Sequence, residues 1–167
     1  NISVIGSGAM GNGIAHVFAQ YGYKVSLIDI STDALNKAIN TIQKNLSRQV
    51  EKGTINEEQK NQALQNITTS SDMSKGVENA ELIVEAATEN VDLKLKIFRE
   101  LDEYTSGSAI LATNTSSISI TKIGSVTNHP ENVVGMHFMN PVPLMKLVEV
   151  IRGKSTSDEV THQVMSI

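Results

Sequence analysis

Short apolar runs alternate along the chain with longer segments whose apolar residues recur at helical spacing. Runs with the length of buried strands occupy residues 2–6, 24–29, 82–86, 109–113, 133–137 and 147–151. Helices are expected at residues 9–21, 35–53, 56–65, 91–104 and 156–167. Strands that alternate with helices predict a doubly wound, mostly parallel sheet with helices on both faces.

Two of the expected helices have apolar faces that can be assigned residue by residue. The long second helix is amphipathic, with apolar positions Leu35, Ala38, Ile39, Ile42, Leu46 and Val50. It ends near Gly53 and forms a hairpin with the polar helix at 56–65, which we interpret as an insertion in the fold. The helix at 91–104 is expected to turn Leu93, Ile97, Leu101 and Tyr104 inward.

Length and composition favour one globular domain, since 167 residues with 40% hydrophobic and 19% charged residues can bury one core. The first expected strand begins one residue from Asn1, and the last expected helix breaks off at Ile167. We therefore expect part of a longer protein. Residues 1–154 would be a dinucleotide-binding domain, and residues 155–167 the start of a connection to a further domain.

Charge and cysteine content make several classes of protein less favoured. A formal net charge of −4 argues against nucleic acid as a partner. No apolar run approaches the roughly 18 residues of a membrane-spanning helix, so no membrane association is expected. The absence of Cys removes thiolate metal sites, and no metal site is expected. It also fits a reducing compartment, so a cytoplasmic location is predicted.

A glycine-rich loop follows the first strand and opens the first helix. Gly6 would permit the tight turn, Gly8 the approach of a pyrophosphate, and Gly11 close packing of helix on strand. Asp29 ends the second strand, where a carboxylate can accept both ribose hydroxyls and would repel a 2′-phosphate. The pattern therefore predicts NAD as the cofactor, in preference to NADP. The alternative is a tight strand-to-helix turn with a solvated Asp29.

Polar residues follow two later strands. Asn114 and Ser116 come directly after the run 109–113, and His137 closes the run 133–136. Because ligands bind beyond the carboxyl ends of parallel strands, Ser116 and His137 are expected to share one crevice. Imidazole has the pKa suited to removing a hydroxyl proton as hydride departs. Local turn chemistry for Asn114 and Ser116, and a packed histidine at 137, are the alternatives.

Glu149 is a charged residue within the apolar run 147–151. A carboxylate commonly holds a catalytic imidazole in one tautomer and stabilises its protonated form. Pairing with His137 would explain Glu149 in a strand that otherwise favours burial. The alternative is an edge strand with Glu149 facing water.

Four segments together resemble the 3-hydroxyacyl-CoA dehydrogenases, over essentially the whole chain. They are Gly-Ser-Gly-Ala-Met-Gly at 6–11, Val84-Glu85-Ala86 with Glu89-Asn90, Asn114-Thr115-Ser116-Ser117, and 136–143 continuing into Lys146-Leu147-Val148-Glu149. The sequence is most similar to the short-chain, 3-hydroxybutyryl-CoA type found as separate bacterial enzymes. The resemblance implies NAD-dependent interconversion of 3-hydroxyacyl-CoA and 3-ketoacyl-CoA.

The resemblance also implies roles for individual residues. His137 would be the catalytic acid/base, Glu149 would orient it, and Ser116 would hydrogen-bond the C3 oxygen of the substrate. Glu89, Lys94 and Asn114 would line the nicotinamide and ribose end of the NAD site. Asn140 would support the catalytic centre.

A basic helical face indicates where the coenzyme A part of the substrate would bind. Lys44, Arg48 and Lys52 recur every four residues on the long helix. The resemblance makes Lys52 the position that contacts coenzyme A. The alternative is an ordinary solvated helix face.

The family also has a helical C-terminal domain, which this sequence lacks. That domain supplies a further catalytic-site Asn, much of the acyl pocket and most of the dimer interface. We therefore expect the parent protein to be a homodimer and the 167-residue piece to be a monomer with little turnover. Two other interpretations remain: an isolated NAD-binding module without turnover, and the dehydrogenase module of a multifunctional β-oxidation protein.

Overall fold

A seven-stranded sheet forms the centre of the computed structural model, which describes all 167 residues. Its strands are β1 (Ile2–Ile5), β2 (Val25–Ile28), β3 (Ile67–Ser70), β4 (Leu82–Glu85), β5 (Ile110–Thr113), β6 (Val133–Phe138) and β7 (Val148–Arg152). The order across the sheet is β3-β2-β1-β4-β5-β6-β7, and only β7 runs antiparallel to its neighbour. The chain therefore reverses its direction across the sheet between β1 and β4.

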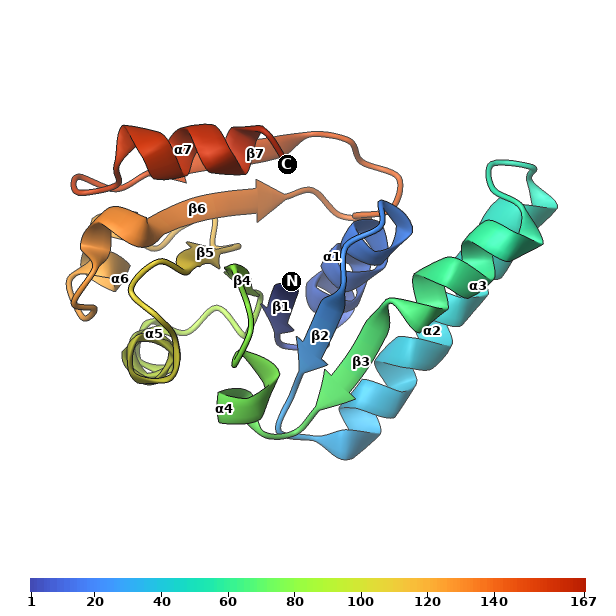
Figure 1. Cartoon of the computed structure of the whole chain (residues 1–167), viewed down its shortest axis with the longest axis horizontal. Helices are drawn as coiled ribbons and strands as arrows, with labels where there is room; N and C mark the ends of the chain where they lie inside the picture. Colours follow the sequence, from blue (N-terminus) through green and yellow to red (C-terminus); the bar gives the residue numbers. More distant parts are fainter.

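The helices cover both faces of this sheet (Figure 1). They are α1 (Ala9–Gln20), α2 (Thr32–Glu51), α3 (Glu57–Gln65), α4 (Met73–Gly76), α5 (Val91–Tyr104), α6 (Ile120–Gly124) and α7 (Asp158–Met165), with a short 3-10 turn at Pro130–Asn132. α2 and α3 lie side by side as a hairpin that projects at one edge of the molecule. No helix is long and apolar enough to span a membrane. The predicted doubly wound, mostly parallel fold with a helical hairpin is confirmed.

Alternation along the strands divides the core into two layers. Apolar residues at alternate strand positions pack against α1, α2 and α7 on one face, and the residues between them pack against α5 and α6 on the other. In β6, for example, Val134 and Met136 belong to the first layer and Val133 to the second. This alternation places His137 on the same face as α5 and α6.

Three elements were not predicted from the pattern: β3, α4 and α6. β3 has the sequence Ile-Thr-Thr-Ser, with no residue fully buried, because it forms the outer edge beside β2. α4 and α6 contain only four and five residues, too few to show a helical period. β3, which the pattern did not predict, is the outermost strand of the sheet and pairs with β2.

The predicted inward face of α5 was partly wrong. Ile97 and Leu101 are buried as expected, but Leu93 and Tyr104 are exposed. Lys94 and Phe98 are buried instead, so the inward face includes a charged residue. The inward face of α5 therefore differs from the all-apolar face that the period predicts, and its buried Lys94 pairs with Glu85 of β4.

Candidate active site

The glycine loop forms the tight connection that its sequence predicts. Gly6 has φ +95°, and a Cβ there would lie 2.8 Å from the carbonyl oxygen of Ala86. At Gly11 a Cβ would lie 1.7 Å from the carbonyl oxygen of Gly6. Both positions therefore require glycine for reasons internal to the fold, since α1 starts in direct contact with the end of β1.

The N-terminus of α1 differs from that of every other α-helix in the chain. α2 to α7 each have a side-chain cap, supplied by Ser31, Asn56, Asp72, Asn90, Ser119 and Ser157. α1 begins at Gly8 with no side-chain cap and no acidic residue in its first turn. A Cβ at Gly8 would meet nothing within 4 Å. Uncapped amides beside open space suit a pyrophosphate, so this loop fits a dinucleotide.

Asp29 is held beside the glycine loop. Its Oδ2 accepts hydrogen bonds from the Ser7 amide at 3.0 Å and the Ser7 hydroxyl at 2.7 Å, and its Oδ1 accepts one from the Ser31 amide at 3.0 Å. Burial alone raises the pKa of Asp29, but the bonds from Ser31 and Ser7 outweigh it and hold the pKa below its ordinary value. The half-buried carboxylate is therefore ionised at neutral pH, and Oδ1, which accepts only one hydrogen bond, keeps a lone pair for a further donor.

Asn114 joins the ends of β5 and β6. Its backbone amide donates to the carbonyl of Glu85, and its side-chain Oδ1 accepts a hydrogen bond from the amide of Phe138 at 2.8 Å. Ser116, two residues further on, is exposed at the same edge of the sheet. The loop that presents Ser116 is therefore fastened to the strand end that presents His137.

His137 and Glu149 are direct cross-strand neighbours. The antiparallel register of β6 and β7 sets His137 opposite Glu149, so both side chains leave the same face of the sheet. His137 is half-buried and Glu149 is exposed. The strand position of Glu149 matches the alternative considered from the sequence, an edge strand with Glu149 facing water, because β7 is the edge strand and Glu149 is exposed there. No hydrogen bond joins the two side chains in this structure.

A buried ion pair lies under the ends of β4 and β5, and the sequence pattern did not predict it. Lys94 Nζ lies 2.6 Å from Glu85 Oε2, and the two side chains are 2% and 0% exposed. Glu85 also accepts hydrogen bonds from the Thr113 hydroxyl and the Ala87 amide, at 2.6 and 2.7 Å. A glutamate in an apolar strand and a lysine on an apolar helix face were the sequence features that could have revealed the pair.

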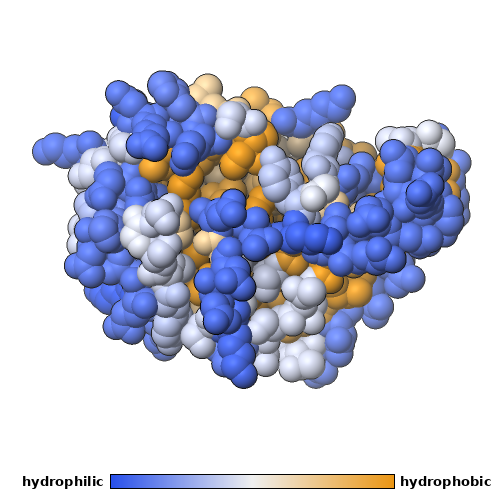
Figure 2. All heavy atoms as spheres, in the orientation of Figure 1, coloured by the Kyte–Doolittle hydropathy of each residue, from blue (hydrophilic) through white to orange (hydrophobic).

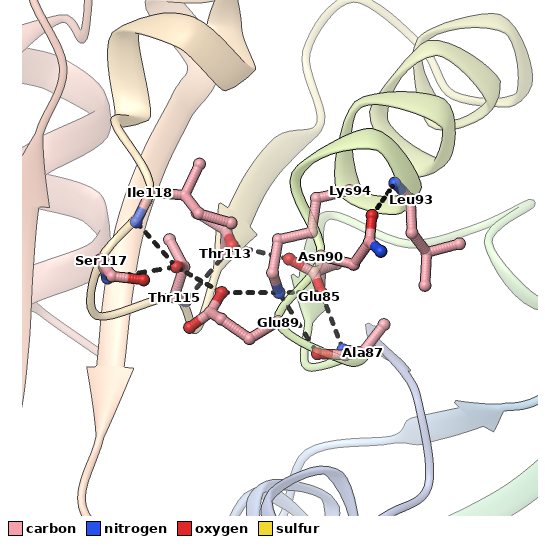
Figure 3. A network of polar contacts seen from close by, with 10 residues as sticks. All are labelled: Glu85, Ala87, Glu89, Asn90, Leu93, Lys94, Thr113, Thr115, Ser117 and Ile118. Atoms are coloured by element: carbon pink, nitrogen blue, oxygen red, sulfur yellow. Dashed lines mark hydrogen bonds and ion pairs between the residues drawn. The ribbon is translucent and has the colours of Figure 1, made fainter.

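Glu89 and Lys94, both expected to line the NAD site, are close to each other (Figure 3). Lys94 Nζ lies 3.7 Å from Glu89 Oε1, and the Thr115 hydroxyl donates to that oxygen at 2.6 Å. Glu89 is about half exposed, whereas Lys94 is enclosed by Glu85 and the carbonyl of Ala87. Glu89 is thus the member of this pair that faces outward.

The remaining expected site residues lie on exposed segments. Asn140 is exposed in the loop between β6 and β7. Lys52 is the C-terminal cap of α2, and Arg48 and Lys44 lie exposed about one and two turns before it, respectively. All three cations are therefore exposed beside the α2–α3 hairpin, with Arg48 donating one 3.5 Å hydrogen bond to the side chain of Asn45.

An apolar groove of about 860 Å³ lies on the opposite face of β6 and β7 from His137 and Glu149. It is bordered by α1, the loop after β6, β7 and α7, with Phe18, Phe138 and Val164 among its lining residues. Figure 2 shows that hydrophobic residues reach the molecular surface between hydrophilic ones on the face drawn there. The groove contains none of the expected site residues, so it is separate from the candidate active site.

The chain was compared with known proteins. Residues 1–167 match the family described as "3-hydroxyacyl-CoA dehydrogenase, NAD binding domain". A 3-hydroxybutyryl-CoA dehydrogenase from Bradyrhizobium diazoefficiens is 48% identical over 94% of this chain and 53% of its own length. A probable 3-hydroxybutyryl-CoA dehydrogenase from Bacillus subtilis is 43% identical over 99% of this chain and 58% of its own length.

A solved structure that shares the name of these relatives also matches the fold of this chain. The crystal structure of 3-hydroxybutyryl-CoA dehydrogenase from Escherichia coli K12 has a TM-score of 0.97 and 42% identity, covering 99% of this chain and 35% of that one. The chain spans about half the length of the two curated relatives above. With this match over its whole length, and an uncapped glycine loop beside the carboxylate of Asp29, the chain belongs to the NAD-binding domain family of the 3-hydroxyacyl-CoA dehydrogenases.

Proposed function

We propose that the parent protein is an NAD-dependent oxidoreductase that interconverts 3-hydroxyacyl-CoA and 3-ketoacyl-CoA. The observation that carries the proposal is the cross-strand placement of His137 and Glu149. The pair lies at the carboxyl ends of the parallel strands, where the glycine loop also lies. The names of the relatives favour a short-chain substrate, 3-hydroxybutyryl-CoA in one direction and acetoacetyl-CoA in the other.

The residues at the glycine loop would hold the cofactor. The amides at the start of α1 would bind the pyrophosphate, and Asp29 would accept hydrogen bonds from the adenosine ribose. Because the sheet order reverses between β1 and β4, the nicotinamide half would extend toward the loops after β4 and β5. Bound NAD supplies a hydride acceptor there.

His137 would remove the hydroxyl proton in the oxidation direction and return it in the reduction direction. Glu149 lies opposite His137 and would move its carboxylate a short way to accept the imidazole N–H, which fixes the tautomer. Ser116 would donate a hydrogen bond to the C3 oxygen of the substrate and orient it. Asn140 would contact the substrate beside this centre, and Lys52 would bind a coenzyme A phosphate.

Turnover of the full-length protein tests this proposal. NADH-dependent reduction of acetoacetyl-CoA and of longer 3-ketoacyl-CoAs should be measured for the unaltered enzyme and for His137→Ala and Glu149→Gln. We expect each variant to lose about 100- to 10,000-fold in turnover with NADH affinity nearly unchanged. His162→Ala, at an exposed position on α7, is the matched control. Near-normal turnover in His137→Ala would refute the assignment.

A second candidate is an NAD-binding module that does not turn over by itself. The chain covers only 53% and 58% of the two curated relatives, which favours this interpretation for the 167 residues alone. A separate enzyme and one module of a multifunctional β-oxidation protein are the two candidates for the parent. We propose a cytoplasmic parent that dimerises through a helical domain joined by residues 155–167, and a monomeric 167-residue chain. An assay of both lengths distinguishes an enzyme from a module without turnover, light scattering tests the two oligomeric states, and the sequence beyond residue 167 separates the two kinds of parent.

A further inference from the structure

One buried hydroxyl connects the loop after β4 to the loop after β5. Thr115 is 2% exposed, and its Oγ1 donates to Glu89 Oε1 at 2.6 Å. The same oxygen accepts hydrogen bonds from the amides of Ser117 and Ile118, at 3.3 and 3.1 Å. Glu89 belongs to the first loop, and Ser117 and Ile118 belong to the second, so a single side chain fixes one loop against the other (Figure 3).

Both loops are also anchored to the same buried ion pair. Glu85 ends β4 and holds Lys94 from α5 at 2.6 Å, and Lys94 lies 3.7 Å from Glu89. Thr113 ends β5, donates to Glu85 and accepts a 3.4 Å hydrogen bond from the amide of Thr115. The ion pair therefore limits the movement of both loops relative to the sheet.

The connected loops lie on one side of the reversal in strand order. The glycine loop and Asp29 follow β1 and β2, and Glu89 and Ser116 follow β4 and β5. We propose that Thr115, supported by the Glu85–Lys94 pair, is a positioning residue that fixes Glu89 and the Ser116 loop at the nicotinamide half of the cofactor site. This inference rests on the placement of that half under the proposed function.

The hydroxyl matters here more than the volume of the side chain. Valine has nearly the shape of threonine, but at position 115 it would leave the amides of Ser117 and Ile118 without their acceptor and Glu89 without its donor. Serine keeps the hydroxyl and loses only a methyl group. Because the contacts of Thr115 lie in the loops after β4 and β5, its loss should affect the nicotinamide half of a dinucleotide and spare the adenosine half.

Calorimetric titrations with NADH and with ADP test this separation, because ADP has the adenosine and both phosphates without the nicotinamide or its ribose. We expect Thr115→Val to weaken NADH binding about tenfold or more and to leave ADP binding within about twofold. Thr115→Ser should restore most of the NADH affinity. Thr127→Val is the matched control: Thr127 is a buried threonine with one hydrogen bond, to the carbonyl of Gly124 at 2.9 Å, outside this network.

The outcomes separate this inference from the proposed function. Equal affinities for NADH and ADP in the unaltered chain would overturn the placement of the nicotinamide half, and the inference with it. Two results would overturn the positioning role alone. In one, Thr115→Val still binds NADH more tightly than ADP by the same factor as the unaltered chain; in the other, the variant loses affinity for NADH and for ADP to the same extent. If Thr115→Val does not fold, Thr113→Val removes the hydrogen bonds that Thr113 makes with Glu85 and with the Thr115 amide, at a buried residue outside the expected cofactor contacts. It should give the same selective loss of NADH, and unchanged NADH binding would overturn the positioning role.

Discussion

Glu85 has no exposed surface, yet its carboxylate is fully satisfied by Lys94, Thr113 and the Ala87 amide. A buried ion pair of this kind contributes little net stability when intact, because desolvation of both charges offsets their attraction. Removing one partner is different, since the other charge is then left buried without compensation. The intact pair therefore adds little to the free energy of unfolding, but each of its two residues is required as long as the other is present.

Substitution at this pair should be strongly non-additive. Lys94→Met alone should lower the free energy of unfolding by about 3–5 kcal/mol, because the Glu85 charge is left uncompensated. Glu85→Gln combined with Lys94→Met should cost clearly less than Lys94→Met alone. Urea denaturation of the two variants and the unaltered chain measures both values. A double variant less stable than Lys94→Met would contradict this account of the pair.

His16 should make stability depend on pH. It is 1% exposed between α1 and α2, where burial lowers its pKa despite opposing hydrogen bonds with the side chains of Gln20 and Gln49. Its Nδ1 has no hydrogen-bond partner, so a second ring proton would be unsatisfied. With a depressed folded-state pKa, the unfolded chain binds the proton first as pH falls below about 6.5, and stability falls from there.

The pH effect can be isolated by replacing the imidazole. Denaturation between pH 7.5 and 5 should show a loss of stability of up to about 1.4 kcal/mol per pH unit from this one group, until pH reaches the folded-state pKa. His16→Gln should show a shallower loss over the same range. His162→Gln, exposed on α7, serves as the control. Identical slopes for His16→Gln and the unaltered chain would rule out this contribution.

At the scale of elements, α1 and its glycine loop serve the fold and the ligand at different positions. Gly11 brings α1 against the carbonyl of Gly6, whereas Gly8 borders open space. Gly11 is required for the packing of α1 on β1, whereas Gly8 is required only for the approach of a ligand to the helix N-terminus. The same three-glycine pattern therefore contains two separable requirements.

Alanine at these two glycines should separate stability from binding. Gly11→Ala should destabilise the chain by roughly 1–3 kcal/mol or more, because its Cβ would collide with backbone that cannot move freely. Gly8→Ala should change stability little, since its φ of −67° is open to any residue, but should weaken NADH binding at least tenfold. Denaturation and NADH titration of both variants decide this. Unchanged NADH affinity in Gly8→Ala would remove the pyrophosphate from this position.

At the scale of the whole molecule, a dinucleotide would contact both halves of the sheet, on either side of the reversal between β1 and β4. Binding at such a position couples to global unfolding, because the site exists only when both halves are folded. NADH at about 100 times its Kd should therefore raise the Tm by roughly 5–10 °C. NADPH at the same concentration should raise the Tm less, since an ionised Asp29 at the ribose position would repel a 2′-phosphate.

Asp29 provides the matched variant for this measurement. Asp29→Ala should reduce the Tm shift produced by NADH and narrow the difference between NADH and NADPH. Asp33→Ala, exposed in the first turn of α2, should leave both shifts unchanged. Equal shifts from the two cofactors in the unaltered chain would mean that Asp29 does not select between them.

The sequence by itself determined the elements with strong local patterns. The runs that became β1, β2, β4, β5 and β6, the long amphipathic α2, and the Gly6–Gly11 loop with Asp29 were all predicted, because each depends on residues close together in the chain. Periodicity reports burial only when an element is long enough to show a period. β3, α4 and α6 are short or half-exposed, so their patterns carried too little information.

Only the tertiary structure decided which distant residues meet. The buried position of Lys94 depends on Glu85 and Thr113, which belong to two neighbouring strands, and hydropathy alone would place a lysine outside. The exposure of Glu149 depends on β7 being the edge strand, and its place opposite His137 depends on the antiparallel register. Strand order, the identity of the edge strand and the pairing register set the environment of each of these charged residues. All three arise from pairing between distant segments, which leaves no period in the sequence.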